Sequence, residues 1–368
     1  MASQAPQRFD ASLPLERAWG LPSCCYLDPA WAEAERRHIF GQTWQAVARV
    51  DQLASPGDFV TVDLAGEPIV LWRDHEGSLR AFYNVCRHRA AVLLSEETGK
   101  LAHVRCPYHG WTYDLAGNLR GTPEFDGVAD FRRDDFGLVP VAVDVWGPIV
   151  WVHLGLPVPL HAYLAPLPEQ SARLGLETLR FVERRTYHLA CNWKVFVDNY
   201  LDGGYHIPPV HPELADCLDY RHYQTTVAGF TSLQCGPLTS GQGLRPGDRA
   251  YYWWVFPNFM INAYRGVMDT NWVVPLDAGR CRVVIDFYFA ETEGEAARSF
   301  MAESIALAER IQQEDIAICE AVQRGLASRS YTAGRFSVRR EAAVYHFHRL
   351  VHERLTVQQA AEGPTSAG

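Results

Sequence analysis

The chain has 368 residues, of which 48% are hydrophobic and 21% are charged, and its formal net charge is −9. That composition is typical of a globular protein, and the length exceeds one comfortable core, so about two domains are expected. The acidic chain has no run of Lys or Arg, no secretory h-region and no membrane-spanning apolar stretch, which argues against nucleic acid and membranes as partners and predicts a cytoplasmic location.

Residues 40–160 are expected to form the first domain, a compact all-β unit. Short strand-forming runs occur at 44–50, 58–64, 68–73, 79–83 and 139–154, and turn pairs of Gly with Asp, Glu or Asn separate them. A proline-rich segment at 157–168 marks the domain boundary. We expect residues 1–39 to be an N-terminal segment that packs on the second domain.

The second domain is expected over residues 161–355. Residues 192–205 are predicted to be helical, residues 223–290 to form antiparallel strands, and residues 296–327 to form one long helix. Helices laid on an antiparallel sheet make this an α+β domain. Residues 356–368 are expected to be a disordered tail.

Two short motifs in the β domain each carry one cysteine and one histidine: Cys86 and His88 in Cys-Arg-His, and Cys106 and His109 in Cys-Pro-Tyr-His. Two thiolates and two imidazoles hold either a tetrahedral zinc or a two-iron cluster, in which the thiolates bind one iron and the imidazoles the other. Zinc sites commonly pair like ligands within each loop, whereas each loop here mixes them. The pattern therefore favours an electron-transfer cluster over a structural zinc.

A second set of metal ligands begins with His206 and His211. Two histidines five residues apart do not share a face of a regular helix, but Pro208 and Pro209 between them prevent the helix from continuing. The chain must turn back, which can bring the two imidazoles together. Two imidazoles and one carboxylate form the ligand set with which non-heme Fe(II) binds and activates O2.

The carboxylate is predicted on the long helix at 296–327. An expected buried stripe follows three- and four-residue steps and comprises Ala308, Ile311, Asp315, Ile318 and Val322. A carboxylate there is costly unless it is neutralised or coordinated, so Asp315 is the predicted third ligand. His346, His348 and His352 form a rival cluster, but arginines surround it, so we interpret it as a polar helix face.

The pattern Cys-x-His, seventeen residues, Cys-x-x-His-Gly-Trp resembles the Rieske [2Fe-2S] domain of the non-heme iron oxygenases. The second half of the chain is similar to the choline monooxygenases of the same family of ring-hydroxylating alpha subunits. The segments that carry this similarity are Asn199-Tyr-Leu-Asp-Gly-Gly-Tyr-His206, Pro257-Asn-Phe-Met-Ile-Asn262, Met268-Asp-Thr-Asn271, and Gln313-Glu-Asp315 leading to Cys319-Glu-Ala-Val-Gln-Arg-Gly-Leu326. The likeness spans roughly residues 30 to 355.

The resemblance implies a fold, cofactors and partners. It implies a Rieske domain followed by a helix-grip (START-like) catalytic domain. The implied ligands are Cys86, His88, Cys106 and His109 for the [2Fe-2S] cluster, and His206, His211 and Asp315 for a mononuclear Fe(II). O2 is then the co-substrate, a ferredoxin or flavin reductase passes on electrons from NAD(P)H, and the assembly is a homotrimer.

Relatives in this family also use a carboxylate to connect the first iron histidine to a cluster histidine of the neighbouring subunit. In many of them the carboxylate lies three residues before that histidine, where this chain has Gly203. Asp202, four residues before His206, is therefore the predicted bridge, and Asp198 stays an alternative. Asn199 is a weaker candidate for a supporting role beside the iron.

The substrate pocket is predicted from an aromatic run on the sheet strands. Trp254, Phe256 and Tyr264 are predicted to present ring faces to a quaternary ammonium group. Arg265 follows the run and would favour a carboxylate-bearing substrate such as a betaine. The leading hypothesis is hydroxylation of choline or a betaine, with or without N-dealkylation. The alternatives are hydroxylation of an aromatic acid or amine and, from another class, a non-catalytic electron-transfer or zinc-stabilised binding protein.

Overall fold

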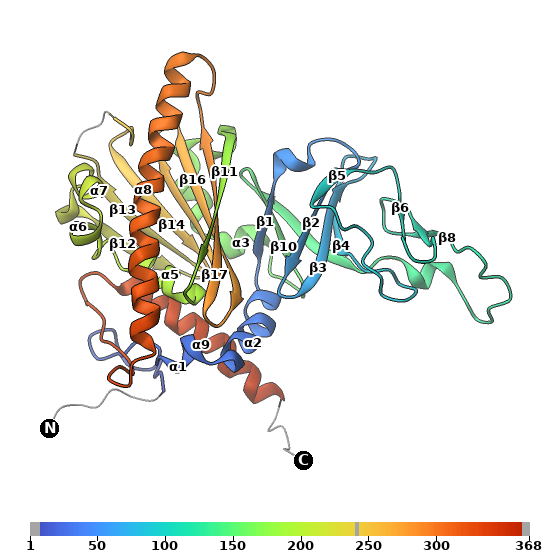
Figure 1. Cartoon of the computed structure of the whole chain (residues 1–368), viewed down its shortest axis with the longest axis horizontal. Helices are drawn as coiled ribbons and strands as arrows, with labels where there is room; N and C mark the ends of the chain where they lie inside the picture. Colours follow the sequence, from blue (N-terminus) through green and yellow to red (C-terminus); the bar gives the residue numbers. More distant parts are fainter. Residues whose placement is uncertain (1–7, 240–242, 363–368) are drawn as a thin grey trace. The chain divides into compact units, whose positions relative to one another are not determined.

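The computed structural model describes residues 8–239 and 243–362, with side chains described as far as residue 356. The chain divides into two compact units, one of residues 40–160 and one of residues 1–39 together with 161–368 (Figure 1). The first unit is all-β, and the second is an antiparallel sheet covered by helices. The predicted fold class is therefore confirmed.

The all-β unit contains a seven-stranded antiparallel sheet of order β1-β10-β9-β4-β3-β2-β5 and a three-stranded sheet of order β6-β7-β8. The strands are β1 Gln45–Arg49, β2 Asp58–Leu64, β3 Glu67–Arg73, β4 Leu79–Tyr83, β5 Thr98–Lys100, β6 Val104–Arg105, β7 Thr112–Tyr113, β8 Leu119–Gly121, β9 Pro140–Trp146 and β10 Ile149–His153. The single run expected at 139–154 is thus a hairpin, because Gly147 adopts a φ of 57° and reverses the chain between β9 and β10.

One core of this unit lies under the two cysteine and histidine motifs. Its buried members include Trp72, Phe82 and Tyr113, and both motif cysteines, Cys86 and Cys106, belong to the same cluster. Trp72 stacks on Phe82 with ring centroids 4.8 Å apart, and its indole N–H donates to the carbonyl of Leu115 at 2.7 Å. The motif loops are therefore held by a packed core, which limits their movement.

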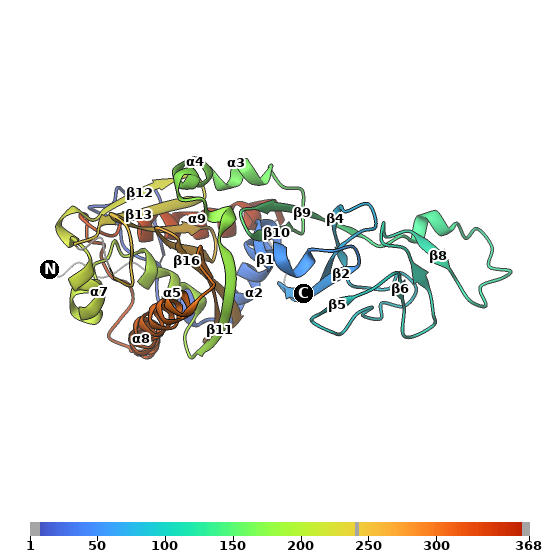
Figure 2. The ribbon, with the colours of Figure 1, turned by 90° about the horizontal axis from the view of Figure 1, so that it is seen from above.

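The second unit is built on a sheet of order β11-β17-β16-β15-β14-β13-β12, with every neighbouring pair antiparallel. The strands are β11 Arg180–Leu189, β12 Gln224–Ala228, β13 Thr231–Pro237, β14 Arg249–Val255, β15 Phe259–Tyr264, β16 Val267–Asp277 and β17 Arg280–Phe289. The helices are α1 Cys24–Leu27, α2 Pro29–His38, α3 Leu160–Leu164, α4 Leu167–Ser171, α5 Trp193–Leu201, α6 Ile207–Val210, α7 Pro212–Cys217, α8 Glu295–Leu326 and α9 Ala342–Glu362. Helices α5 and α8 cover one face of the sheet, and α3 and α4 lie on the other side (Figure 2).

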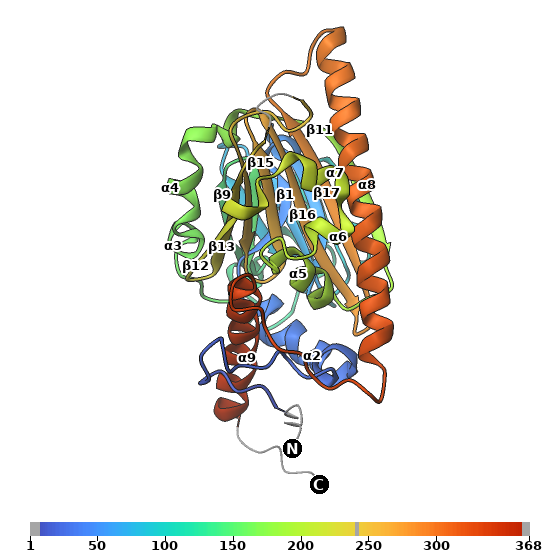
Figure 3. The same ribbon diagram turned by 90° about the vertical axis from the view of Figure 1, so that its left-hand side faces the viewer.

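The long helix α8 runs along the sheet (Figure 3), and its buried side differs from the predicted stripe. Its buried residues include Ile305, Gln312, Cys319 and Leu326, which recur every seven residues. Ile318 and Val322, which were expected in the stripe, are 37% and 44% exposed. The reason is that α8 packs on α5 through Cys319, whose thiol lies 4.0 Å from the carbonyl of Val195, and this turns residue 318 outward.

The N-terminal helices and α9 belong to the same unit. The Lys194 ammonium of α5 lies 2.5 Å from Glu35 of α2, and both side chains are buried. Helix α9 extends to Glu362, so the predicted tail at 356–368 overlaps its last turns, and residues 363–368 lie outside the described residues. Within the described residues, no helix combines the length and apolar character needed to cross a membrane.

Candidate active site

The cluster loops of the all-β unit have the same backbone design. In the first loop, the Cys86 amide donates to the carbonyl of Ala91, and the Ala90 amide donates to the carbonyl of Cys86. In the second loop, the Cys106 amide donates to the carbonyl of Trp111, and the Gly110 amide donates to the carbonyl of Cys106. Ala90 and Gly110 both have positive φ, 57° and 72°. Each loop thus holds its cysteine by the same pair of backbone hydrogen bonds, although the histidine follows two residues later in the first loop and three residues later in the second.

The two imidazoles of these loops lie together. The ring centroids of His88 and His109 are 4.6 Å apart, and Trp111 stacks on His88 at 4.8 Å. Nδ1 of His88 is buried and has no hydrogen-bond partner within the described residues. A buried polar atom without a partner is costly, so this nitrogen fits a metal ligand.

The two thiols form the other half of the site and are buried, with Cys86 2% and Cys106 3% exposed. The Tyr113 hydroxyl lies 3.5 Å from the Cys86 sulfur. In a tetrahedral zinc site, all four ligand atoms lie within about 4 Å of one another. Within the described parts of the chain, the one set of three or more such atoms within 4.8 Å is elsewhere, at His206, His211 and Asp315. Separate thiol and imidazole pairs fit a two-iron cluster better than one zinc.

The second site begins where α5 ends. Gly203 and Gly204 adopt positive φ values of 71° and 72°, and the chain then enters the short helix α6 at His206. A Cβ atom at position 203 would lie 2.2 Å from the backbone oxygen of Arg340, so glycine is required there. This turn places both histidines beside α8. The structure therefore brings together the three predicted ligands His206, His211 and Asp315.

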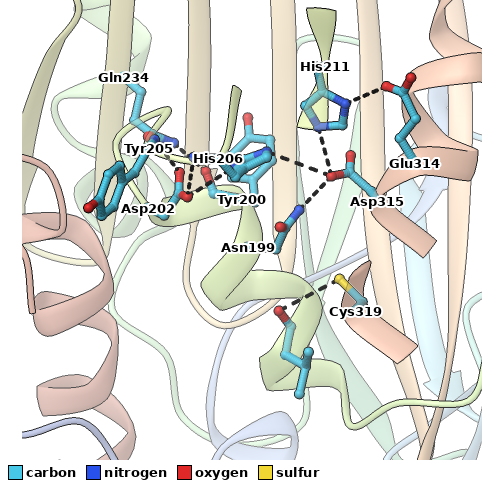
Figure 4. Close-up of polar contacts among 11 residues, drawn as sticks. Asn199, Tyr200, Asp202, Tyr205, His206, His211, Gln234, Glu314, Asp315 and Cys319 are labelled. Carbon is cyan, nitrogen blue, oxygen red and sulfur yellow. Dashed lines mark hydrogen bonds and ion pairs between the residues drawn. The ribbon is translucent and has the colours of Figure 1, made fainter. Parts of the chain in front are cut away.

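The three ligand groups face one another (Figure 4). Nε2 of His211 lies 3.0 Å from Oδ1 of Asp315, and Nε2 of His206 lies 3.7 Å from the same oxygen. The ligand atoms of His206, His211 and Asp315 all lie within 4.8 Å of one another. Two imidazole nitrogens and one carboxylate in this arrangement would hold a mononuclear iron beside the cavity that these three residues line.

Each histidine of the second site is oriented by a further carboxylate. Nδ1 of His206 lies 2.8 Å from Oδ2 of Asp202, and Nδ1 of His211 lies 2.6 Å from Oε2 of Glu314. Such contacts fix the imidazole so that Nε2 is available to a metal. Although burial opposes it, hydrogen bonds to Asp315 and Glu314 raise the pKa of His211. Three carboxylates around two imidazoles suit a divalent cation.

Asn199 and Asp198 have different hydrogen-bond partners. The Asn199 amide donates to Oδ1 of Asp315 at 2.7 Å, so it holds the ligand carboxylate. Asp198 instead accepts from the Tyr26 hydroxyl at 2.6 Å and lies 2.9 Å from Nε2 of His348. His348 is 4% exposed. The interpretation of its helix as a polar face is therefore wrong at this position, because Asp198 and Tyr26 give His348 buried partners.

A cavity of about 100 Å³ adjoins the three iron ligands. Its aromatic lining comprises Phe196, Tyr200, Tyr223, Tyr252 and Tyr264, and its polar lining includes Arg245, Asn262, Asp269 and Asn271. Tyr252 pairs with Asn262 across β14 and β15, and Asn262 pairs with Asp269 across β15 and β16. The cavity wall is therefore a row across three strands, which the sequence order does not reveal.

The predicted substrate pocket requires correction at three of its four residues. Tyr264 lines the cavity, but Trp254, Phe256 and Arg265 do not. The indole of Trp254 and the ring of Phe256 pack on Phe347 of α9. Arg265 is exposed, because it lies in the turn between β15 and β16. The cavity has an arginine, but it is Arg245 from the segment before β14.

Comparisons with known proteins agree with this geometry. Residues 176–357 match the family model of the ring hydroxylating alpha subunit (catalytic domain), and residues 43–132 match that of the Rieske [2Fe-2S] domain. Choline monooxygenase, chloroplastic, of Arabidopsis thaliana is 39% identical over 96% of this chain and 87% of its own length. The carnitine monooxygenase oxygenase subunit of Escherichia coli (strain K12) is 33% identical over 94% of this chain and 96% of its own length.

Solved structures also resemble this chain over nearly its whole length. The quaternary ammonium Rieske monooxygenase CntA in complex with L-carnitine superposes with a TM-score of 0.81 and 31% identity, over 96% of this chain and 99% of that one. Naphthalene 1,2-dioxygenase, at 17% identity and a TM-score of 0.78, shares the fold. The predicted family, the two iron cofactors and the use of O2 are thereby confirmed. This chain belongs to the Rieske non-heme iron oxygenases, as a catalytic alpha subunit related to the choline and carnitine monooxygenases.

Proposed function

We propose that this chain hydroxylates a small quaternary ammonium compound with O2 and electrons from a reductase. The observation that carries the proposal is the cavity itself, which combines the three iron ligands with five aromatic side chains. Ring faces attract a quaternary ammonium group, each contact contributing about 0.5 to 2 kcal/mol. The relatives named for choline and carnitine support the same substrate class.

The size of the cavity is consistent with a small substrate. Its volume is about 100 Å³, several times the space that one water molecule needs. Choline and short betaines are of this size. The buried rings of Tyr252 and Tyr264, whose hydroxyls lie 2.8 Å apart, form a wall that excludes water.

The side chains around the iron site would hold the metal and orient its ligands. His206, His211 and Asp315 would hold the iron, and Asn199 and Glu314 fix the positions of Asp315 and His211. When bound, the iron supplies O2 activation and the cluster supplies single electrons. The substrate is positioned by the cavity wall, so that one C–H bond lies beside the open side of the site.

We propose Asp202 as the residue that connects the iron site to a cluster histidine of a neighbouring subunit. Its Oδ2 contacts Nδ1 of His206, and its side chain is 15% exposed, so a partner can reach it. Asp198 is less suited, because Tyr26 and His348 occupy its carboxylate. A CntA structure described for inter-subunit electron transfer supports this arrangement. A head-to-tail homotrimer and a ferredoxin or flavin reductase complete the proposal, and the cytoplasmic location stays a prediction.

The proposed function is tested by O2 uptake with a surrogate reductase and NADH. The substrate panel contains choline, glycine betaine, γ-butyrobetaine, carnitine and several aromatic acids and amines. We expect at least one quaternary ammonium compound to raise O2 uptake and to give a hydroxylated or dealkylated product by mass spectrometry. Turnover of an aromatic acid or amine alone would refute the proposed substrate class.

A further inference from the structure

Arg245 is a buried cation in the wall of the iron cavity. Its side chain is 6% exposed and lines the cavity. Nη1 donates to Oγ of Ser304 at 3.0 Å and to the carbonyl of Leu244 at 3.3 Å. Nε is buried and has no hydrogen-bond partner within the described residues. A guanidinium with a donor left free beside a cavity indicates a missing acceptor.

The protein itself does not supply a counter-ion in contact with Arg245. Within the described parts of the chain, no carboxylate forms an ion pair with it, and the sequence of residues 240–242, Ser-Gly-Gln, contains no acid. Asp269 of the same cavity is held by other groups: its Oδ2 accepts hydrogen bonds from the amides of Asn262 at 2.7 Å and Asn271 at 3.3 Å. A buried guanidinium in protein normally pairs with a carboxylate or phosphate, so its natural partner here is an anion that enters the cavity.

The charge of Arg245 is retained despite burial. Burial alone lowers the pKa of a guanidinium, but Tyr264 and Asp269 outweigh it and raise the pKa of Arg245. The guanidinium carbon lies 4.9 Å from the centroid of the Tyr264 ring, which also stabilises the cation. An incoming group therefore meets a full positive charge at this part of the wall.

The position of Arg245 relative to the iron ligands follows from α8. Its partner Ser304 and the ligand Asp315 lie on nearly the same side of α8, because eleven residues make about three turns, and their Cα atoms are roughly 16 Å apart. Ala308, Ile311 and Gln312 between them also line the cavity. The cavity thus extends along the helix from the iron ligands toward Arg245, and a ligand held at Arg245 extends from there toward the iron.

We infer that Arg245 binds the carboxylate of a zwitterionic substrate that carries a quaternary ammonium group at its other end. This inference rests on the proposed function and narrows it from quaternary ammonium compounds in general to betaines with a spacer between the two charges. Tyr264 and Asp269 lie beside the guanidinium. The cationic end therefore meets other aromatic side chains of the cavity, Phe196, Tyr200 and Tyr223. A choline molecule lacks the anion that Arg245 requires.

The test compares two ligands of equal length that differ in charge at the end opposite the ammonium group. γ-Butyrobetaine has a carboxylate, and its primary amide has a neutral group of nearly the same shape. Binding to the anaerobic, iron-loaded oxygenase is measured by calorimetry, which does not depend on turnover. We expect γ-butyrobetaine to bind the unmodified protein about 100-fold more tightly than the amide. Arg245→Met should remove this difference, and Arg245→Lys should retain part of it.

Arg249→Met is the matched control, because Arg249 is a partly buried arginine of the same strand region that donates to the Cys235 sulfur and does not line the cavity. It should leave both affinities unchanged. Equal binding of the two ligands by the unmodified protein would overturn the inference. A parallel loss of both affinities in Arg245→Met, with the melting temperature lowered, would assign Arg245 a structural role instead and also overturn it.

A further ligand separates this inference from the proposed function. 5,5-Dimethylhexanoate has the carboxylate and the shape of γ-butyrobetaine but a tert-butyl group in place of the ammonium. If it binds and is hydroxylated as well as γ-butyrobetaine, the quaternary ammonium requirement fails while the role of Arg245 stands. If γ-butyrobetaine and its amide are hydroxylated and bind alike, the proposed function stands and the role of Arg245 fails.

Discussion

The two metal sites of this protein use their imidazoles in opposite ways. In the catalytic unit, Nδ1 of His206 and Nδ1 of His211 each contact a carboxylate, and both Nε2 atoms face Asp315. In the all-β unit, Nδ1 of His88 is buried without a partner within the described residues, and the neighbouring ligands are thiols. The first arrangement suits one cation with open positions, and the second suits a closed cluster that transfers electrons.

The largest expected effect separates the cluster site from the rest of the molecule. Cys106→Ser should abolish the red-brown absorbance, the reduced-cluster EPR signal and turnover. Because Cys106 lies in the core of the all-β unit and metal binding contributes to folding, this unit should also melt at a lower temperature. Cys217→Ser, a free and partly exposed cysteine outside that unit, is the control. A Cys106→Ser protein that keeps its cluster signal would contradict the ligand assignment.

The next effect is confined to the second site. Asp315→Ala should lose the mononuclear iron and all turnover but keep the cluster absorbance, because the two sites share no ligand. Iron analysis together with the visible spectrum measures both results on one sample. Glu303→Ala, an exposed acid on the same helix, should retain iron and activity. Normal turnover by Asp315→Ala would show that another group binds the iron.

A comparison of two aspartates tests which one connects the two kinds of site. Asp202→Asn should keep both metals and slow the oxidation of the reduced cluster, in the presence of O2 and substrate, by about 10- to 100-fold. Asp198→Asn should instead lower stability by about 1 to 3 kcal/mol, because it disturbs the buried contacts of Tyr26 and His348. Stopped-flow spectroscopy and thermal unfolding distinguish these outcomes, and the reverse pattern would make Asp198 the bridge.

The smallest expected effect concerns the carboxylate behind His211. Glu314→Gln keeps an oxygen that accepts from Nδ1 but removes the charge, so iron affinity should fall by about tenfold. Added Fe(II) should restore turnover, which a catalytic defect would not allow. Titration of the iron-free protein with Fe(II), read out by activity, gives the affinity. An unchanged affinity would mean that Glu314 does not orient the imidazole.

The cluster loops could be read from the sequence because their design is local. Each loop is a short segment between two strands, with Cys, His and a residue of positive φ in order. The ligands of the catalytic site could be predicted only by combining two separate signals. Pro208 and Pro209 indicate a turn between the two histidines, and Asp315 stands out as a charge on an amphipathic helix.

Features that depend on packing between distant elements could not be read in this way. Arg245 lies in a segment before β14, and its place in the cavity depends on α8. Trp254 and Tyr252 share one face of β14, yet Trp254 packs on α9 while Tyr252 lines the cavity. His348 is buried because Asp198 of α5 and Tyr26 of α1 meet it. Sequence periodicity indicates a face, but not which neighbour covers it.

The two separate iron centres are tested most directly by the content of iron, acid-labile sulfide and zinc per chain in protein purified without oxygen. We expect two cluster irons, two sulfides and one further iron, with zinc absent from both sites. Asp315→Ala should then lose one iron and no sulfide. Iron without sulfide, zinc in the Cys86 and Cys106 site, or iron content that Asp315→Ala leaves unchanged would contradict two separate iron centres.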